Sequence, residues 1–410
     1  MASAVVLSAP YVRGAHFLLG QFWHRESSPM PQKLQLTKLE AKTKPAIFSF
    51  FAGVGFLDLG FEKNGFDVVF VNEIYKPFLT GYQTARLGLK MKEPIFGYYD
   101  GDIKKLLDDN EGRDLQKKVN AAKRTHRLVG FIGGPPCPDF SVGGKNRGRE
   151  GKNGVLSKVY TELIAKQQPD FFLFENVKGL WKTKVHRAFY EELKAKLKKA
   201  GYIMTERLIN AVEYGAPQDR DRIILLGFRK KSFPMIGKEI GTDFPWEKFL
   251  KYRSEYVFGK GWPETDKFGE NAMRKKPLQI IEELTVEYWF KKNNVEKHPN
   301  ALDAFTPRQA LPRFKVIPEG DVSRKSFKRI HRWRYSPTAA YGNNEVHLHP
   351  YKVRRLAISE VLAIQSLPKE FVLPSEMTLS DKFKSVGNGV PYEAASGVAK
   401  TIISFIKKNI

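Results

Sequence analysis

The segment from residue 46 to residue 73 constrains the fold most, because apolar runs and a glycine turn alternate there in a fixed order. Residues 47–51 form an apolar run typical of a buried strand, and residues 52–55 follow as a tight turn. Apolar residues then recur at helical spacing from Phe56, and residues 67–72 predict a second strand. Strand, turn, helix and strand in this order predict an α/β domain with a mostly parallel sheet.

An acidic residue lies where such a fold binds a nucleoside. Glu73 follows the second predicted strand, about twenty residues after the glycine turn, where dinucleotide-binding folds place a carboxylate for the ribose hydroxyls. The turn lacks the third glycine of the pyrophosphate fingerprint, which favours an adenosyl ligand without phosphates over NAD. Asp102 could end a third strand and bind the adenine amino group, although an Asp-Ile pair is more often a turn.

The only cysteine of the 410 residues lies in a loop that prolines make rigid. The apolar residues 128–132 predict a short buried strand, and two glycines and two prolines separate it from Cys137. A lone cysteine is usually a small core residue. The prolines on both sides of Cys137, however, cannot continue a strand or helix that would bury it. We therefore interpret Cys137 as an exposed nucleophile that needs only a local charge environment to become a thiolate.

Two further polar segments lie beside predicted strands. Glu175 follows the apolar residues 171–174, and residues 218–222 precede another apolar run. The carboxyl ends of parallel strands meet at one edge of a sheet. We therefore expect Glu175 to lie at the same edge as Cys137 and Glu73.

The composition indicates a polyanionic partner. Lys and Arg total 69 against 44 Asp and Glu, a formal net charge of +25 at pH 7. Nucleic acid is the commonest partner for such an excess, and a merely well-solvated surface is the alternative. A single cysteine excludes a disulfide framework and a cysteine-rich zinc site, and the eight scattered histidines suggest no metal site. No apolar stretch is long enough to span a bilayer.

Several motifs, taken in order, resemble the DNA cytosine-5 methyltransferase family. They are Gly-Pro-Pro-Cys at 134–137, Glu-Asn-Val at 175–177 and Gln-x-Arg-x-Arg at 218–222, behind a glycine turn like that for S-adenosylmethionine. Residues 354–368 resemble the family's penultimate motif and residues 386–391 resemble its last. The chain departs from the usual family residues at four positions, Ser49 for Asp, Phe56 for Gly, Pro138 for Gln and Gly389 for Ser.

The resemblance implies methylation of carbon 5 of cytosine. This carbon is too weakly nucleophilic to take a methyl group until a thiolate adds at carbon 6, and Cys137 would supply the thiolate. Glu175 would share a proton with ring N3. Arg222 would hold the O2 edge, and Arg220 would orient the site and favour the thiolate. The methyl group would come from S-adenosyl-L-methionine, with cofactor contacts from Phe51, Gly53, Gly55, Glu73, Ile74, Asp102, Ile103, Pro136 and Asn388.

The resemblance also implies a division of the chain. Residues 1–45 would be an N-terminal extension and linker, and residues 46–230 a Rossmann-like catalytic and cofactor-binding domain. Residues 231–353 would form a smaller inserted target-recognition domain, and residues 354–410 would complete the catalytic domain. Because a base inside a duplex is inaccessible, the target cytosine would have to be flipped out of the stack.

A basic cluster indicates where the inserted domain would contact DNA. Residues 324–334 contain six Lys and Arg residues, no acid, and interleaved aromatic residues. Such side chains can neutralise phosphates or read guanine, and Asn can read adenine, although a solvated basic strand is the alternative. His347 and His349 are expected at the surface or facing DNA, and the glycine-rich loop 143–154 is either a lid over DNA or an inert loop. The candidate DNA contacts are Ser141, Lys145, Arg147, Arg324, Lys325, Lys328, Arg329, Arg332, Arg334, Asn343 and Asn344.

Other classes of protein remain open at this point. An RNA cytosine methyltransferase could share the catalytic motifs, but the long basic insertion favours double-stranded DNA. A catalytically inactive DNA-binding regulator is disfavoured, because Cys137, Glu175 and Arg222 are all present. Methylation of an amino group is disfavoured, because Pro-Pro-Cys replaces the Pro-Pro-aromatic motif of that chemistry. We expect a monomeric, cytoplasmic, prokaryotic enzyme of the restriction-modification type, with a cognate restriction endonuclease as a possible partner.

Overall fold

The computed structural model of the protein describes residues 44–136, 152–182, 184–237, 240, 243–324, 326–339, 341 and 346–410. Several predictions concern residues outside this described part. They are the extension up to residue 43, the glycine-rich loop up to residue 151, and Cys137, Ser141, Lys145, Arg147, Lys325, Asn343 and Asn344.

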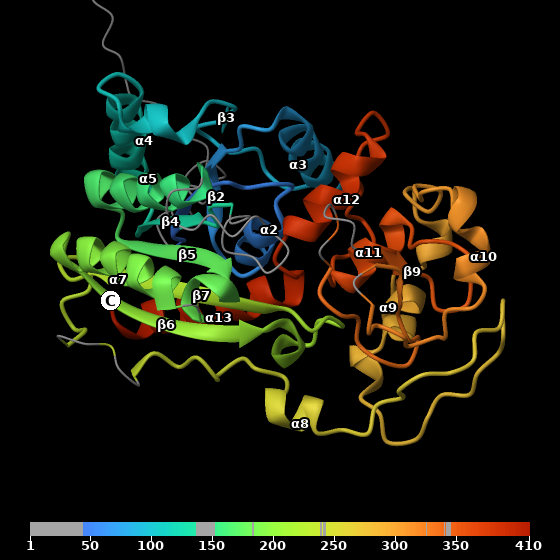
Figure 1. The fold of residues 1–410 in the computed structure, drawn as a ribbon. Coiled ribbons are helices and arrows are strands. Elements are labelled where there is room, and N and C mark those ends of the chain that lie inside the picture. The colour runs from blue at the N-terminus through green and yellow to red at the C-terminus, as the bar shows by residue number, and fades with distance from the viewer. Residues whose placement is uncertain are drawn as a thin grey trace, which may run out of the picture.

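Residues 46–229 are built on a seven-stranded sheet in the order β3-β2-β1-β4-β5-β7-β6 (Figure 1). Neighbouring strands from β3 to β5 pair in parallel, whereas β7 runs antiparallel to both β5 and β6. This mostly parallel, Rossmann-like sheet confirms the predicted α/β fold class. The strands are β1 (Ala46–Phe50), β2 (Asp67–Asn72), β3 (Tyr98–Tyr99), β4 (Val129–Gly133), β5 (Phe171–Val177), β6 (Tyr202–Asn210) and β7 (Asp221–Arg229).

Apolar runs in the sequence predict β1, β2, β4, β5 and β7. The edge strand β6 is not predicted, because polar residues interrupt its apolar pattern and its middle is only half-buried. The third strand, β3, ends at Tyr99, earlier than the expected end at Asp102.

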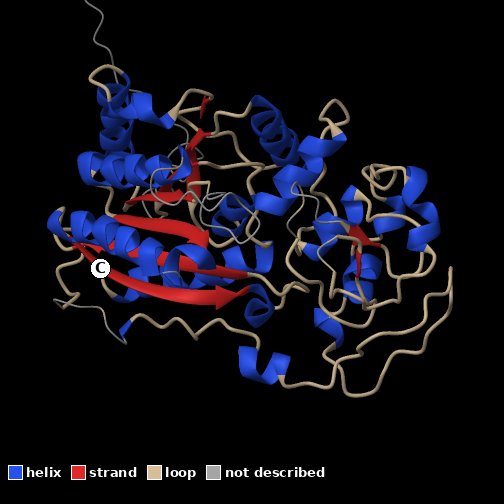
Figure 2. Ribbon diagram, in the orientation of Figure 1, coloured by secondary structure: helices blue, strands red, loops and turns tan. Residues whose placement is uncertain are grey.

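Helices cover both faces of the sheet, as Figure 2 shows. Alternate residues of β1 point to different faces. Ile47 packs with Phe61 of α2 and Phe405 of α13 on one face, whereas Phe48 packs with Leu115 of α4 and Tyr160 of α5 on the other. The helices of this part are α2 (Phe56–Glu62), α3 (Lys76–Gly88), α4 (Glu111–Thr125), α5 (Lys152–Gln167), α6 (Lys178–Lys182), α7 (Lys184–Lys199) and α13 (Tyr392–Lys408).

The region between β7 and α13 consists of short elements joined by long loops. A two-stranded parallel sheet of β8 (Lys328–Arg329) and β9 (His347–Leu348) lies within it. Its helices are α8 (Ser254–Phe258), α9 (Val286–Lys292), α10 (Leu311–Phe314), α11 (Ile358–Ile364) and α12 (Leu379–Asn388).

One apolar cluster joins this region to the sheet. It packs residues of α9, α11 and α12 against Val54 and Phe56, which follow β1. The C-terminal helices therefore lie against the glycine turn. The domain boundaries at residues 46, 231 and 354 stay predictions. Within the described part, no helix combines the length and apolar character needed to cross a membrane.

Candidate active site

The parallel strands bring four segments that the sequence analysis singled out to one edge of the sheet. In the strand register, Phe50 at the end of β1 is level with Asn72 of β2 and Gly133 of β4, and Gly133 is level with Phe174 of β5. The glycine turn, Glu73, the Gly-Pro-Pro segment and Glu175 follow these four positions directly. The expected alignment of Glu73 and Glu175 along the carboxyl edge is therefore present.

The carboxylate of Glu73 holds the glycine turn. Oε2 of Glu73 accepts a hydrogen bond of 2.9 Å from the backbone N–H of Gly53, and Oε1 accepts one of 2.9 Å from Tyr75 N–H. Gly53 and Gly55 have φ of 58° and 90°, a conformation that glycine adopts without strain. Burial raises the pKa of Glu73, and the two backbone N–H groups oppose that shift. Each carboxylate oxygen keeps a lone pair free to accept a hydroxyl.

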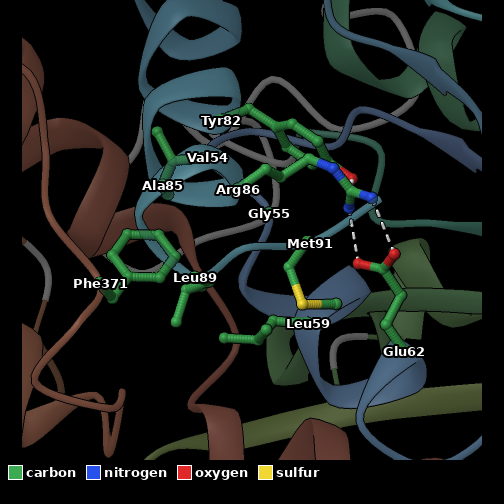
Figure 3. A pocket seen from close by; sticks show the side chains of 10 residues that line it. All are labelled: Val54, Gly55, Leu59, Glu62, Tyr82, Ala85, Arg86, Leu89, Met91 and Phe371. Atoms are coloured by element: carbon green, nitrogen blue, oxygen red, sulfur yellow. Dashed lines mark hydrogen bonds and ion pairs between the residues drawn. The ribbon is translucent and has the colours of Figure 1, made fainter. Parts of the chain in front are cut away.

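A buried polar network lies behind the turn. Ser49 Oγ and Tyr82 O–H each donate a hydrogen bond of 2.8 Å to the carboxylate of Asp58. The guanidinium of Arg86 donates to both oxygens of Glu62, at 2.6 and 2.9 Å (Figure 3). The cavity that Tyr82, Arg86 and Glu62 help to line has a volume of about 10 Å³, enough for one water molecule and far too small for a nucleoside. This cavity is therefore not the cofactor site, and the polar network around it lies behind the glycine turn.

The predicted general acid is paired with the predicted O2-binding arginine. Nε of Arg222 lies 2.7 Å from Oε1 of Glu175, and both side chains are nearly buried. Burial raises the pKa of Glu175, whereas the charges of Arg222 and Arg220 lower it. The carboxyl group of Glu175 is thus protonated more readily than a carboxyl group in water.

The Gly-Pro-Pro segment packs directly on this acid. A Cβ at Gly134 would lie 2.5 Å from Oε2 of Glu175, so any other residue at position 134 would displace the carboxylate. Asn176 Nδ2 also donates a hydrogen bond of 3.4 Å to Pro135 O. Cys137 is three residues beyond Gly134 in the chain and lies outside the described residues.

Arg220 is an internal anchor. Its side chain is almost fully buried. NH1 donates to Ala339 O at 3.0 Å, and NH2 donates to Gly387 O at 2.7 Å. Burial lowers the pKa of Arg220, and the neighbouring Arg222 adds to this effect. Arg220 therefore joins the segment before β7 to two distant segments, and its role in orienting the site and favouring the thiolate stays a prediction.

The remaining predicted cofactor residues lie around the same edge. Asp102 caps the short 3₁₀ helix η1 (Ile103–Leu107) by accepting a hydrogen bond of 3.0 Å from Lys104 N–H, which is the turn alternative. Ile103 is buried, whereas Ile74, Pro136 and Asn388 are exposed and Phe51 is half-buried with φ of 55°.

Two residues that the sequence analysis did not single out also shape this edge. Asn72 Nδ2 donates to Tyr99 O and Gly101 O, each at 3.0 Å, and so fixes the segment before Asp102. Tyr75 O–H donates a hydrogen bond of 2.8 Å to Asp381 of α12. Both residues lie within two positions of Glu73 in the sequence, and this proximity is the signal that could have indicated them.

The basic cluster is divided by burial, and the expectation of DNA contact is wrong for two of its members. Arg329 is fully buried and donates to backbone carbonyl oxygens, including that of Ile317 at 2.8 Å. Arg332 is buried in an ion pair with Glu319, with two contacts of 2.8 Å. Neither guanidinium can meet a phosphate, because internal acceptors already hold it. Arg324 is exposed, and Lys328 and Arg334 are half-buried.

The two histidines near β9 are also not at the surface, contrary to expectation. His347 and His349 are almost fully buried. Burial lowers the pKa of His347 to about 3, so this ring is neutral at physiological pH. His349 Nε2 lies 3.4 Å from Glu360 of α11. Both rings therefore belong to the core of this region.

The described residues contain no group of three or more His, Cys, Asp or Glu side chains that could hold a metal ion.

Comparisons with known proteins agree with this arrangement. The family model of C-5 cytosine-specific DNA methylases matches residues 46–404. The Type II methyltransferase M.NmeDI of Neisseria meningitidis serogroup C is 50% identical over 396 residues, covering 95% of this chain and 92% of that protein. M.FnuDI of Fusobacterium nucleatum, another Type II methyltransferase, is 30% identical, with 87% of this chain and 93% of that protein covered.

Solved structures share the fold at lower identity. A putative DNA modification methyltransferase encoded within a prophage of E. coli has a TM-score of 0.55 and 20% identity, with 89% of this chain and 99% of that chain covered. A DNMT2 mutant of Spodoptera frugiperda has a TM-score of 0.53 and 17% identity, with 88% of this chain and 100% of that chain covered. The motifs, the geometry and the extent of these matches identify the chain as a member of the C-5 cytosine-specific DNA methylase family, with DNA (cytosine-5-)-methyltransferase activity.

Proposed function

We propose that this enzyme transfers a methyl group from S-adenosylmethionine to carbon 5 of a cytosine in duplex DNA, through a covalent adduct of Cys137 at carbon 6. The observation that carries the proposal is the Glu175–Arg222 pair, held at 2.7 Å against Gly134 at the end of β4. The peptide chain places Cys137 three residues beyond Gly134. Because Cys137 follows Gly134 so closely in the sequence, we infer that the acid, the cation and the thiol act together at this edge.

The residues at this edge fit the cofactor. Glu73 presents carboxylate oxygens fixed by two backbone N–H groups, which suits two ribose hydroxyls. The side chain of Ile74 is 58% exposed next to it and offers an apolar surface for the adenine ring. A Cβ at Gly53 would meet no atom within 4 Å, so space lies beside the turn. When bound, S-adenosylmethionine supplies an electrophilic methyl group.

The chemistry then assigns one role to each residue. The Cys137 thiolate forms a bond to carbon 6, and the electrons of the 5,6 double bond move toward carbon 5. Glu175 donates its proton to ring N3 and so prevents a full negative charge on the ring. Arg222 donates hydrogen bonds to O2. Carbon 5 then takes the methyl group, and S-adenosylhomocysteine is the leaving group. Water takes the proton of carbon 5, the electrons of that bond re-form the 5,6 double bond, and the bond from carbon 6 to Cys137 breaks with its electrons returning to sulfur. Ring N3 returns its proton to Glu175.

The target cytosine must leave the duplex to reach this edge, so we infer base flipping. The basic residues that remain exposed in the described part, such as Arg324, support a DNA-reading role for the region between β7 and α13. The relatives are named Type II methyltransferases. We therefore infer that the enzyme protects DNA from an endonuclease that cuts the same sequence.

Trapping with fluorocytosine tests the proposal. Bisulfite sequencing of DNA from cells that express the protein first identifies the methylated sequence. A duplex with 5-fluorocytosine at that position should form a denaturant-resistant adduct in the presence of S-adenosylmethionine, because fluorine cannot leave as a cation. Mass spectrometry should map the adduct to Cys137, and Cys137→Ala should abolish it.

A different attached residue, or methylation of carbon 5 by the Cys137→Ala variant, would contradict the mechanism. Methyl transfer to tRNA but not to genomic DNA would favour the RNA alternative.

A further inference from the structure

Gly389 is a glycine for reasons of space alone. Its φ of −68° and ψ of 153° are ordinary extended values that any residue adopts. A Cβ at this position would lie 2.1 Å from Cδ2 and 2.7 Å from Cε2 of Phe56. Atoms that are not bonded do not approach so closely, so a side chain at residue 389 requires the ring of Phe56 to move.

The ring of Phe56 is buried and packed against other apolar side chains. Phe56 is 2% exposed and begins α2, immediately after the glycine turn. Its ring meets the ring of Phe371 edge-on, with 5.2 Å between the centroids. The ring therefore fills the space that a side chain at residue 389 would need, although 333 positions separate the two residues in the chain.

A second close approach holds the other side of the same segment. A Cβ at Gly387 would lie 2.9 Å from both the backbone N and the backbone O of Tyr341. Gly387 O also accepts the hydrogen bond of 2.7 Å from Arg220. Asn388 lies between these two glycines and is exposed. The position of Asn388 is thus fixed by the backbone of Tyr341 on one side and by the ring of Phe56 on the other.

The helix that ends at Asn388 is also tied to the loop of the ribose-binding carboxylate. Tyr75 O–H donates a hydrogen bond of 2.8 Å to Asp381 of α12. Nζ of Lys384 lies 4.9 Å from the centre of the Tyr75 ring. The glycine turn, the Glu73 loop and Asn388 are therefore one packed unit.

We propose that Phe56 and Gly389 form a size-matched pair that positions Asn388 beside the glycine turn and thereby sets the affinity for S-adenosylmethionine. This inference rests on the proposed function, because it needs the cofactor to bind at that turn. The ring of Phe56 occupies the space that a side chain at residue 389 would need. Phe56 and Gly389 are positioning residues and touch none of the reacting atoms.

A double-mutant cycle tests the pairing. The dissociation constant of S-adenosylmethionine is measured by calorimetry for the wild type, Gly389→Ser, Phe56→Ala and the double variant. Gly389→Ser should weaken binding about tenfold or more in the wild-type background, but by less than about threefold in the Phe56→Ala background. In kinetics, Gly389→Ser should raise KM for S-adenosylmethionine by a similar factor and leave kcat within about threefold.

Further variants keep the test decisive. Gly389→Ala adds only the clashing Cβ, and Phe56→Leu provides a second background if Phe56→Ala does not fold by circular dichroism. Gly261→Ala is the matched control, because Gly261 is exposed and a Cβ there meets no atom within 4 Å. It should leave the dissociation constant unchanged.

Two results overturn the pairing while the wild type binds normally. One is a folded Gly389→Ser variant with wild-type affinity, even if its melting temperature falls. The other is an equal loss in both Phe56 backgrounds. Wild-type protein that binds no S-adenosylmethionine would instead overturn the proposed function together with this inference.

Discussion

Arg329→Met should destabilise the region between β7 and α13 without acting through DNA. The buried guanidinium of Arg329 donates hydrogen bonds to the carbonyl oxygens of Phe314, Ile317, His349 and Lys352. Met keeps most of the buried stem and removes every donor, so at least the three fully buried acceptors lose their partner. Because an unpaired buried acceptor costs about 1–3 kcal/mol, we expect the free energy of unfolding to fall by at least about 3 kcal/mol.

Urea unfolding followed by circular dichroism measures this loss. Arg324→Met is the matched control, because Arg324 is exposed and has one ion pair, 3.3 Å from Asp321. It should change the free energy of unfolding by less than about 0.5 kcal/mol. If Arg324 contacts a phosphate, Arg324→Met should still weaken DNA binding, and the DNA affinity should fall less steeply with salt concentration than that of the wild type. An Arg329→Met variant within about 1 kcal/mol of wild type would refute the assignment of Arg329 to the core.

Three further predictions concern the cofactor, the acid and pH. Glu73→Ala should weaken S-adenosylmethionine binding by about 1.5–3 kcal/mol in calorimetry, through loss of charge-assisted bonds to the ribose, and unchanged affinity would remove Glu73 from the pocket. Glu175→Gln should slow single-turnover methylation by about 10²–10⁴-fold. Since burial raises the pKa of Glu175 and the protonated form acts, the wild-type rate should fall as pH rises through that pKa. The pKa of buried His347 is about 3, so the ring is neutral in the folded state but takes up a proton in the unfolded state below about pH 6.5. The free energy of unfolding should therefore fall by up to about 1.4 kcal/mol per pH unit as the pH drops below about 6.5. In urea titrations, the free energy of unfolding of His347→Phe should fall less between pH 7 and pH 5 than that of the wild type.

The sequence predicts the parts of the fold that local patterns determine. Apolar runs bounded by Gly, Pro or acids mark β1, β2, β4, β5 and β7, because strands that are buried on both faces of a sheet are apolar along most of their length. The edge strand β6 escapes this signal. Its residues Thr205, Glu206 and Arg207 are polar and each is only half-buried, so β6 contains no continuous apolar run.

Burial of charged residues depends on partners that the local sequence does not show. Residues 324–334 contain no acid, which makes the run look like a solvated surface. The acid that pairs with Arg332 is Glu319, which lies just outside the run, and Arg329 is bound by carbonyl oxygens on both sides of it in the chain. Backbone carbonyl oxygens exist at every residue, so no pattern of side chains reveals which of them face inward. The match between Phe56 and Gly389 is hidden for the same reason, since only the folded chain brings them together.

The spacing of Gln-x-Arg-x-Arg follows from the backbone that carries it. Arg222 lies in β7, and Gln218, just before that strand, forms an isolated parallel bridge to Ser336. Gln218 and Arg220 hold the region that precedes α11, through Ala339 N–H and Ala339 O, each at 3.0 Å. Arg222, two residues further on, holds the carboxylate of Glu175. The short segment 218–222 therefore contacts both the region between β7 and α13 and the predicted acid Glu175, so few residues separate the two contacts in the chain.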